Sequence, residues 1–213
     1  MGGDTVRPQL VEGNILPCMV VKSRTQDDCY VVMVIGTEYI GLLPRDEAQF
    51  QYYQGSVLWA TLSKMMGWKN LFTQKSEQYV KSVLNGIFAA SPIRVLKVAG
   101  AQNAGFWKVL VSHNELSDRR EIIADCVRRS SGMLRRHLSD KVTFVPMSLD
   151  PEEQIVNALL PGQPEDVRRV MLLPDENRAV VYVEPFKKAI FLGKSGLNVA
   201  TAGKLTGWRI EIQ

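Results

Sequence analysis

Short runs of apolar and β-branched residues alternate with turn residues over the first third of the chain. The runs between Asn14 and Lys75 are ILPCMVVKS, DDCYVVMVI, TEYIGLLP, SVLWATLSK and NLFTQ. Five strands at near-regular spacing, with no strong helical pattern among them, predict a small closed β-barrel of the oligonucleotide-binding (OB) type.

The second and third strands of such a barrel face its ligand, and aromatic side chains there stack on bases at about 1 to 3 kcal/mol per base. Tyr30 and Tyr39 occupy these two predicted strands. Each tyrosine is a candidate for base stacking. The equally weighted alternative is that one or both tyrosines cover the barrel core or its rim.

The pattern changes at Ser76. In SEQYVKSVLNGIF, apolar residues recur at spacings of three and four, which predicts an amphipathic helix with one buried stripe. Two strand-like runs follow, PIRVLKVAG and GFWKVLVS, and the AQNAG between them is typical of a hairpin turn. The segment then predicts a helix over about 115–127, a polar break at RRSSG, a helix over about 133–138 and a strand at KVTFVP.

The same order of elements repeats in the last third of the chain. DPEEQIVNALL predicts a helix in which Asp150 is the cap and Pro151 the first helical residue. It is followed by strands VRRVMLL and AVVYVE, helix EPFKKAIFL, the break GKSG, helix LNVATAGKLTG and strand WRIEIQ. Two units of about 65 residues therefore share one topology, and a small, polar, basic break separates the central helices of each.

The GKSG break is not a P-loop, because the pattern G-x-x-x-x-G-K-[ST] requires a glycine where the chain has Lys188. A glycine-flanked tetrapeptide between two helices is instead the loop by which KH domains clamp a single-stranded backbone. Glycines at both ends let a phosphate approach the backbone, and the following helix N-terminus favours an anion. The expected RNA-binding residues are Gly193, Lys194, Ser195 and Gly196 in the loop, with Ile190 and Val199 beside the groove; Asn198 is a helix cap or a further RNA contact.

Charge adds a second candidate surface. The net charge is +4, yet residues 1–75 hold 7 Lys+Arg against 7 Asp+Glu, so the excess lies in the remainder. A local cluster of arginines can neutralise phosphates, although a solvated helix face is an equal alternative for each arginine taken alone. The cluster in 119–136 comprises Arg119, Arg120, Arg128, Arg129, Arg135 and Arg136 against Glu121 and Asp125.

Composition and spacing argue against other classes of function. With 46% hydrophobic and 23% charged residues the chain resembles ordinary globular proteins, and no apolar run approaches the length of a membrane span. Three cysteines without CxxC spacing, two histidines distant from Cys18 and Cys29, and no paired carboxylates near a histidine support neither a disulfide framework nor a metal or acid/base site. We therefore expect no enzyme activity, no catalytic residue, no cofactor and no membrane partner.

The end of the chain resembles a known family. GKSGLNVATAGKLTGWRIEI is similar to the end of the second KH domain of bacterial NusA transcription factors, in its glycine-basic-x-glycine loop, Asn-Val pair and Leu-Thr-Gly-Trp. DPEEQIVNALLP resembles the start of that domain, and LLPRDEA and FTQKSEQYVKSVL resemble the barrel and its junction. The resemblance implies an α+β multidomain chain: a five-stranded S1-type OB barrel followed by two prokaryotic-type (type II, αββααβ) KH domains.

By this resemblance the chain would bind single-stranded nascent RNA and modulate pausing, termination or antitermination by RNA polymerase. Its partners would be RNA and RNA polymerase or other transcription-complex proteins, with the chain a monomer within a larger complex. A bacterial cytoplasmic setting is expected, with an organellar (plastid) one left open. The alternative function is a structural docking subunit of a transcription or ribosome-like assembly.

Two departures from the family pattern are visible. In the first KH unit the glycine loop aligns with Arg128, Arg129, Ser130 and Ser131, so both glycines are replaced and Gly132 follows one place late. The arginines are expected to hold phosphates without the usual loop geometry. The family's N-terminal polymerase-binding domain is also missing, which fits either an excised module or a short paralogue. The predicted partition is 1–13 leader, with a cloning artefact as the alternative at MGGD, 14–75 barrel, 76–148 first KH domain and 149–213 second KH domain.

Overall fold

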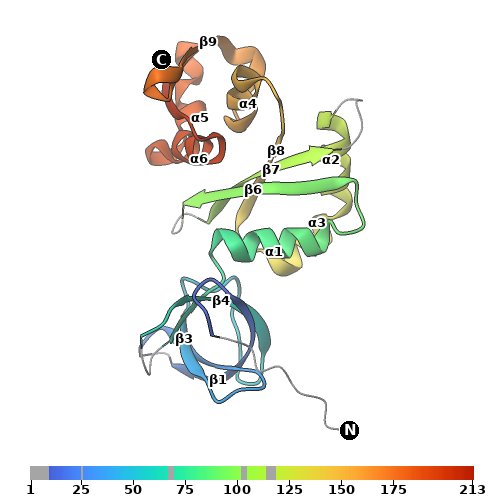
Figure 1. Ribbon diagram of the computed structural model, residues 1–213, viewed down its shortest axis with the longest axis vertical. Helices are drawn as coiled ribbons and strands as arrows, with labels where there is room; N and C mark the ends of the chain where they lie inside the picture. The colour runs from blue at the N-terminus through green and yellow to red at the C-terminus, as the bar shows by residue number, and fades with distance from the viewer. Residues whose placement is uncertain (1–9, 25, 67–69, 102–104, 114–118) are drawn as a thin grey trace. The chain divides into compact units, whose positions relative to one another are not determined.

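The computed structural model describes residues 10–24, 26–66, 70–101, 105–113 and 119–213 (Figure 1). The chain divides into two compact units, Met1–Ser82 and Val83–Gln213. The predicted start of the helix at 115 lies outside the described residues, as does most of the AQNAG turn.

The first unit contains the predicted barrel. Its strands are β1 (Ile15–Arg24), β2 (Cys29–Val34), β3 (Ile40–Pro44), β4 (Val57–Lys64) and β5 (Asn70–Thr73). They close in the order β1-β2-β3-β5-β4, with β3 parallel to β5 and the other pairs antiparallel. The expectation of a closed five-stranded barrel is therefore confirmed.

Alternation along β1 shows how the sequence closes this barrel. Leu16, Cys18 and Val20 are buried, while the residues between them are partly exposed. Gly41 permits the parallel contact of β3 with β5, because a Cβ there would lie 2.5 Å from the Phe72 ring and 2.6 Å from the Asn70 carbonyl oxygen. The barrel core consists of such inward residues from all five strands.

An αββααβ module follows. Its elements are α1 (Glu77–Ile87), β6 (Ile93–Ala101), β7 (Phe106–His113), α2 (Arg119–Arg129), α3 (Ser131–His137) and β8 (Lys141–Pro146). β7 is the central strand, antiparallel to β6 and parallel to β8. The predicted stripe of α1 is buried at Tyr79, Val80 and Leu84.

The predicted break at RRSSG is wrong in its extent. Arg128 and Arg129 form the last turn of α2, and the single residue Ser130 separates α2 from α3. Arginine has a high helix propensity, so the helix continues through both residues. The polar letters in this stretch mark an exposed helix end rather than a loop.

The second module repeats the order with α4 (Pro151–Ala158), β9 (Val167–Leu173), β10 (Arg178–Val183), α5 (Lys188–Leu192), α6 (Leu197–Thr206) and β11 (Arg209–Ile212). β10 is central, antiparallel to β9 and parallel to β11. Asp150 caps α4 as predicted, since its side chain accepts a 3.0 Å hydrogen bond from the Glu152 amide. The helix predicted at EPFKKAIFL is shorter, because Pro185–Lys187 form a 3₁₀ turn before α5.

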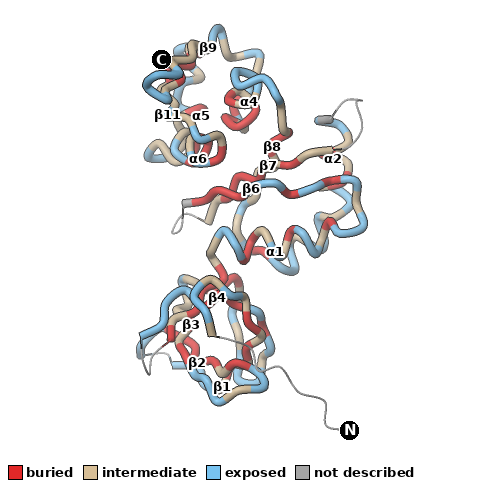
Figure 2. Tube along the Cα trace, in the orientation of Figure 1, coloured by how far each residue is buried: buried red, intermediate tan, exposed pale blue. Residues whose placement is uncertain are grey.

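The two αβ modules pack against each other through one hydrophobic cluster. α6 packs on β6 and β7, and α4 packs on β8 (Figure 1). Ala99 and Val145 of the first module are buried in the same cluster as Ile155, Val181 and Phe191 of the second. Figure 2 shows this buried band along the first module's strands and on α4 and α6.

Candidate nucleic-acid interface

The GKSG loop joins α5 to α6 and adopts left-handed backbone conformations. Gly193 has φ +70°, Ser195 φ +52° and Gly196 φ +74°. The Gly193 amide closes α5 on the Ala189 carbonyl at 2.9 Å, and the Gly196 amide bonds the Gly193 carbonyl at 3.1 Å. These short bonds turn the chain sharply and leave Lys194 and Ser195 exposed at the tip.

The two glycines are required for different reasons. A Cβ on Gly193 would lie 2.7 Å from the Cβ of Asn198 and 3.0 Å from its amide nitrogen, so packing excludes a side chain. A Cβ on Gly196 would meet nothing within 4 Å, and only its positive φ favours glycine. Gly196 therefore presents bare backbone to open space at the N-terminus of α6, where a helix dipole favours an anion.

Asn198 has neither of the roles predicted for it. Its side chain is buried, and its amide nitrogen donates to the carbonyl oxygens of Leu159 at 3.0 Å and Phe191 at 2.9 Å. It lies inside α6, whose N-terminal cap is Gly196. Asn198 thus joins α6 to the end of α4 and the end of α5 by buried hydrogen bonds.

The surroundings of the loop combine cationic and apolar side chains. Ile190 is 45% exposed on α5, while Val199 is only partly exposed and packs against the core. Among the residues that the structure describes, Lys194 forms no ion pair. On β9, Arg168 makes two 2.8 Å hydrogen bonds to Glu184, and these lower the pKa of the Glu184 carboxyl. Lys194 is therefore an exposed cation available to a ligand at this tip.

The corresponding position of the first module has no loop. Ser130 has φ −88°, and Gly132 lies within α3 without a positive φ. The side chains of Arg128 and Arg129 are 77% and 70% exposed, and both pair with Asp125, at 3.6 Å and 2.6 Å. The predicted impairment of backbone approach fits this geometry.

Tyr30 is a core residue, so the stacking role predicted for it is wrong. It is 1% exposed, and its hydroxyl accepts hydrogen bonds from Arg45 at 3.0 Å and from the Tyr52 amide at 3.1 Å. The Arg45 guanidinium lies 4.5 Å from the ring centroid. The structure supports the alternative, in which Tyr30 packs in the barrel core. Tyr39 is 49% exposed just before β3 and stays a candidate for stacking.

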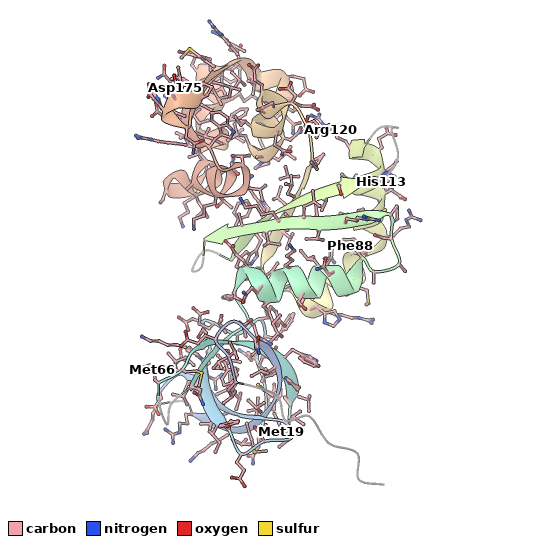
Figure 3. All side chains as sticks on the ribbon, viewed as in Figure 1. Met19, Met66, Phe88, His113, Arg120 and Asp175 are labelled. Carbon is pink, nitrogen blue, oxygen red and sulfur yellow. The ribbon has the colours of Figure 1, made fainter. Side chains whose placement is uncertain are left out.

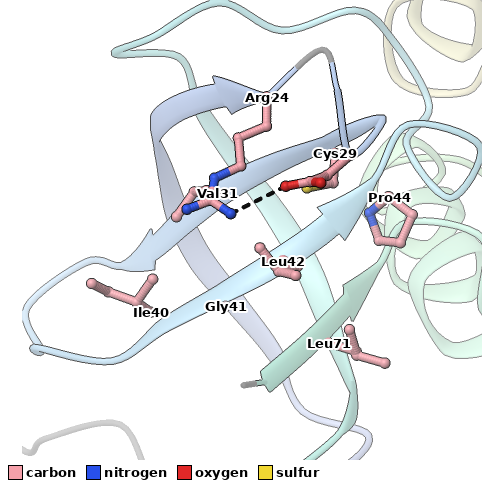
Figure 4. Close-up of a pocket in the computed structure, with 9 residues that line it drawn as sticks. Arg24, Cys29, Val31, Ile40, Gly41, Leu42, Pro44 and Leu71 are labelled. Carbon is pink, nitrogen blue, oxygen red and sulfur yellow. Dashed lines mark hydrogen bonds and ion pairs between the residues drawn. The ribbon is translucent and has the colours of Figure 1, made fainter. Parts of the chain in front are cut away.

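A hollow of about 560 Å³ lies on the outer face of the barrel (Figure 4). Its wall is mainly aliphatic, and Arg24 lies at its edge in a 3.1 Å ion pair with Asp27. Neither predicted tyrosine lines it. Sequence reasoning missed this surface, although the outward positions of the alternating strands could have indicated it. The apolar lining residues are Cys29, Val31, Ile40, Leu42, Pro44 and Leu71, with Gly41 among them.

Sequence reasoning also missed three lysines that join the modules. Lys108 of β7 is fully buried and donates to the carbonyl oxygens of Ala158 at 2.6 Å and Leu160 at 2.5 Å, at the end of α4. Lys97 donates to the carbonyls of Lys204 at 2.7 Å and Leu205 at 3.0 Å, and Lys204 donates to Gly100 at 3.1 Å.

Burial lowers the pKa of Lys108 to about 7, with Lys141 adding to the shift. Arg120 adds a further tie, a 2.7 Å hydrogen bond from α2 to Asn157 of α4 (Figure 3). These contacts fix the GKSG loop and the arginines of α2 and α3 within one unit.

A closed five-stranded barrel followed by two αββααβ modules, the second with a glycine-x-x-glycine loop, defines an S1-KH-KH architecture. Residues 151–213 match the family model described as the NusA-like second KH domain. The chain is 36% identical over 73 residues to the transcription termination/antitermination protein NusA of Rickettsia prowazekii, covering 34% of this chain and 14% of that protein. Residues 151–213 thus resemble the second KH domain of NusA proteins.

Two further NusA proteins are similar over longer stretches. That of Bacillus subtilis is 32% identical over 95 residues, covering 43% of this chain and 25% of its own length. That of Thermus thermophilus is 27% identical over 225 residues, covering 95% of this chain and 53% of its own length. The chain thus spans about half or less of the curated relatives that it matches. No helix among the described residues is long and apolar enough to cross a membrane.

Proposed function

We propose that this chain is a non-enzymatic, NusA-like RNA-binding transcription factor. It binds single-stranded nascent RNA and modulates pausing, termination or antitermination by RNA polymerase, in the bacterial cytoplasm. The relatives named as transcription termination/antitermination proteins support the transcription role. RNA polymerase or another transcription-complex protein is the proposed protein partner.

The observation that carries the proposal is the geometry of the GKSG loop. Lys194 and Ser195 are exposed between two glycines of positive φ, at the N-terminus of α6. A phosphate placed there would meet bare backbone at Gly196, the positive end of the helix and the Lys194 ammonium. Ile190 offers an exposed apolar contact for an adjacent base.

The test is binding of fluorescent single-stranded RNA, measured by anisotropy over a salt series. In the double variant Lys194→Asp, Ser195→Asp, affinity should fall about tenfold or more, because a charge-assisted hydrogen bond is worth about 1.5–3 kcal/mol. The control is Lys81→Asp, Ser82→Asp on α1, which makes the same change of residue types and charge.

Equal loss in both variants would mean that only net charge matters, and the loop would then not be an RNA clamp. If the intact chain bound no RNA at any salt concentration, the docking-subunit alternative would replace the proposal. Its support is the mainly aliphatic hollow on the barrel, which lacks the aromatic lining expected for RNA and whose one basic residue, Arg24, is paired with Asp27.

A further inference from the structure

The helical hairpin of α2 and α3 is one of two strongly basic stretches of the chain. Residues 119–137 contain six arginines against Glu121 and Asp125, a net charge of +4. The whole chain has 26 Lys+Arg and 22 Asp+Glu, which is also +4. Residues 185–208, which include the GKSG loop, contain four lysines and no acidic residue, which is also +4, so the long-range attraction of a polyanion is directed to both stretches.

Within this hairpin some arginines form ion pairs with an acidic side chain and others do not. Asp125 pairs with both Arg128 and Arg129 on α2. Arg135 and Arg136 on α3 are exposed, and neither forms an ion pair among the described residues. Within the hairpin, the arginines free of an ion pair among the described residues therefore include Arg135 and Arg136 on α3, beyond the position where the family pattern places its loop.

The helix α3 contributes little to the core. It has no buried residue, and its last turn contains Arg135, Arg136 and His137. Adjacent residues of a helix point about 100° apart, so the two arginines reach different phosphates rather than one. Guanidinium groups also form two parallel hydrogen bonds with a phosphate, which needs no close approach of the backbone.

We infer that Arg135 and Arg136 on α3 hold two phosphates of a single-stranded RNA through their side chains, in place of the missing glycine loop. This inference rests on the proposed function and assigns the first module a different mode of binding from the second. The GKSG loop fixes one backbone position by close approach, whereas α3 supplies a salt-sensitive contact that is independent of sequence.

An acidic protein is the less favoured ligand for α3. In protein–protein interfaces, most of the binding energy comes from a few buried aromatic or apolar residues that are surrounded by polar ones. On α3 the exposed large apolar side chain is Met133, at 47% exposure, beside two arginines and a histidine. This composition is typical of a phosphate-backbone surface rather than of a protein-docking pocket.

The experiment measures RNA affinity of the full chain across a salt series for Arg135→Gln, Arg136→Gln. Loss of two phosphate contacts should make the log–log salt slope shallower by about 1.4, at about 0.7 per contact for single strands. RNAs of unrelated sequence should show the same change. Arg128→Gln, Arg129→Gln should change the slope less, because Asp125 already pairs with both arginines.

The control for net charge is Arg94→Gln, Arg169→Gln, which removes two exposed arginines from β6 and β9, neither of them ion-paired among the described residues. An equal slope change in this control would overturn the assignment to α3. An unchanged slope in Arg135→Gln, Arg136→Gln would overturn it as well. In that case, loss of binding in the GKSG variant would leave the proposed function standing.

A labelled polyglutamate peptide separates the two ligand classes. If it bound the intact chain as tightly as RNA at matched ionic strength, and lost this affinity in Arg135→Gln, Arg136→Gln, an acidic protein would be the ligand and the inference would be wrong. Circular dichroism of each variant establishes that the helices remain. Because both substitutions are at exposed positions outside the core, we expect no change in the spectrum.

Discussion

Asn198 is a buried side-chain amide that joins α6 to the ends of α4 and α5. Its side chain joins the carbonyl oxygens of Leu159 and Phe191, and its Oδ1 is buried with no hydrogen-bond partner among the described residues. Position in the sequence favoured a cap or an RNA contact, because Asn198 follows the glycine loop. The burial of Asn198 depends on where α4 and α5 end in the folded structure, and the local sequence pattern does not indicate this.

Replacement of Asn198 by alanine should therefore affect stability more than RNA binding. Two buried carbonyl oxygens would lose a donor, at a cost of about 1–3 kcal/mol for each unsatisfied group. Urea unfolding should show a lower midpoint, while affinity for RNA measured well below the transition stays close to that of the intact chain. An unchanged midpoint combined with weak RNA binding would instead make Asn198 an RNA contact.

Gly196 and Gly207 form a matched pair at the two ends of α6. Both have positive φ, +74° and +84°, and a Cβ on either would meet nothing within 4 Å. Alanine at either position should cost about 1 kcal/mol of stability through backbone strain. RNA affinity should fall only for Gly196→Ala, because that Cβ would occupy the space offered to a phosphate; equal affinity in both variants would contradict this role.

At the scale of elements, the strands and the repeat could be predicted from periodicity. Alternation identified all five barrel strands, and the order helix-strand-strand-helix-helix-strand was visible twice. Errors arose where polarity was taken as a loop, as at Arg128 and Arg129, which continue α2. The GKSG loop could be predicted because its glycines are a local requirement of the backbone.

The lysine contacts could not be predicted, because they join residues far apart in the sequence. Lys108 contacts carbonyls 50 and 52 positions away, and Lys97 contacts carbonyls 107 and 108 positions away. A lysine in a strand usually faces solvent. Here the ends of α4 and α6 present carbonyl groups that need donors, and a cation near a helix C-terminus is favoured.

The contact of β7 with α4 predicts a pH dependence of stability. Burial lowers the pKa of Lys108 from 10.5 to about 7, and the neutral amine still has two N–H donors for its two carbonyls. Between about pH 7 and 10.5 the unfolded chain binds a proton that the folded chain does not. Stability should therefore rise with pH in this window, by at most about 1.4 kcal/mol per pH unit, and be independent of this group below it.

Denaturant unfolding of the intact chain and of Lys108→Met at several pH values measures this effect. The rise attributable to this group should be absent in Lys108→Met. It should persist in Lys97→Met, a control that removes the partly exposed contact with the end of α6. A rise of equal size in the Lys108 variant would show that other groups cause it.

At the scale of the whole molecule, two modules that are separable in the sequence are joined by one hydrophobic cluster. Ala99 and Val145 are buried with Val181 and Phe191, and the lysine ties cross the same boundary. We therefore expect the two modules to unfold together. Such a unit holds α3 and the GKSG loop at a constant spacing, so one RNA strand can contact both without an ordering cost between modules.

Hydrogen exchange of backbone amides tests this cooperativity. Val181→Ala in β10 should cost roughly 2 kcal/mol, since it leaves a cavity in a fully buried position, and should lower the protection of β7 amides by the same free energy as that of β10 amides. Leu62→Ala in the barrel is the control, because Leu62 is equally buried but belongs to the other compact unit. If Val181→Ala lowered protection only within the second module, the shared core would not couple the two, and the spacing between α3 and the GKSG loop would be free to vary.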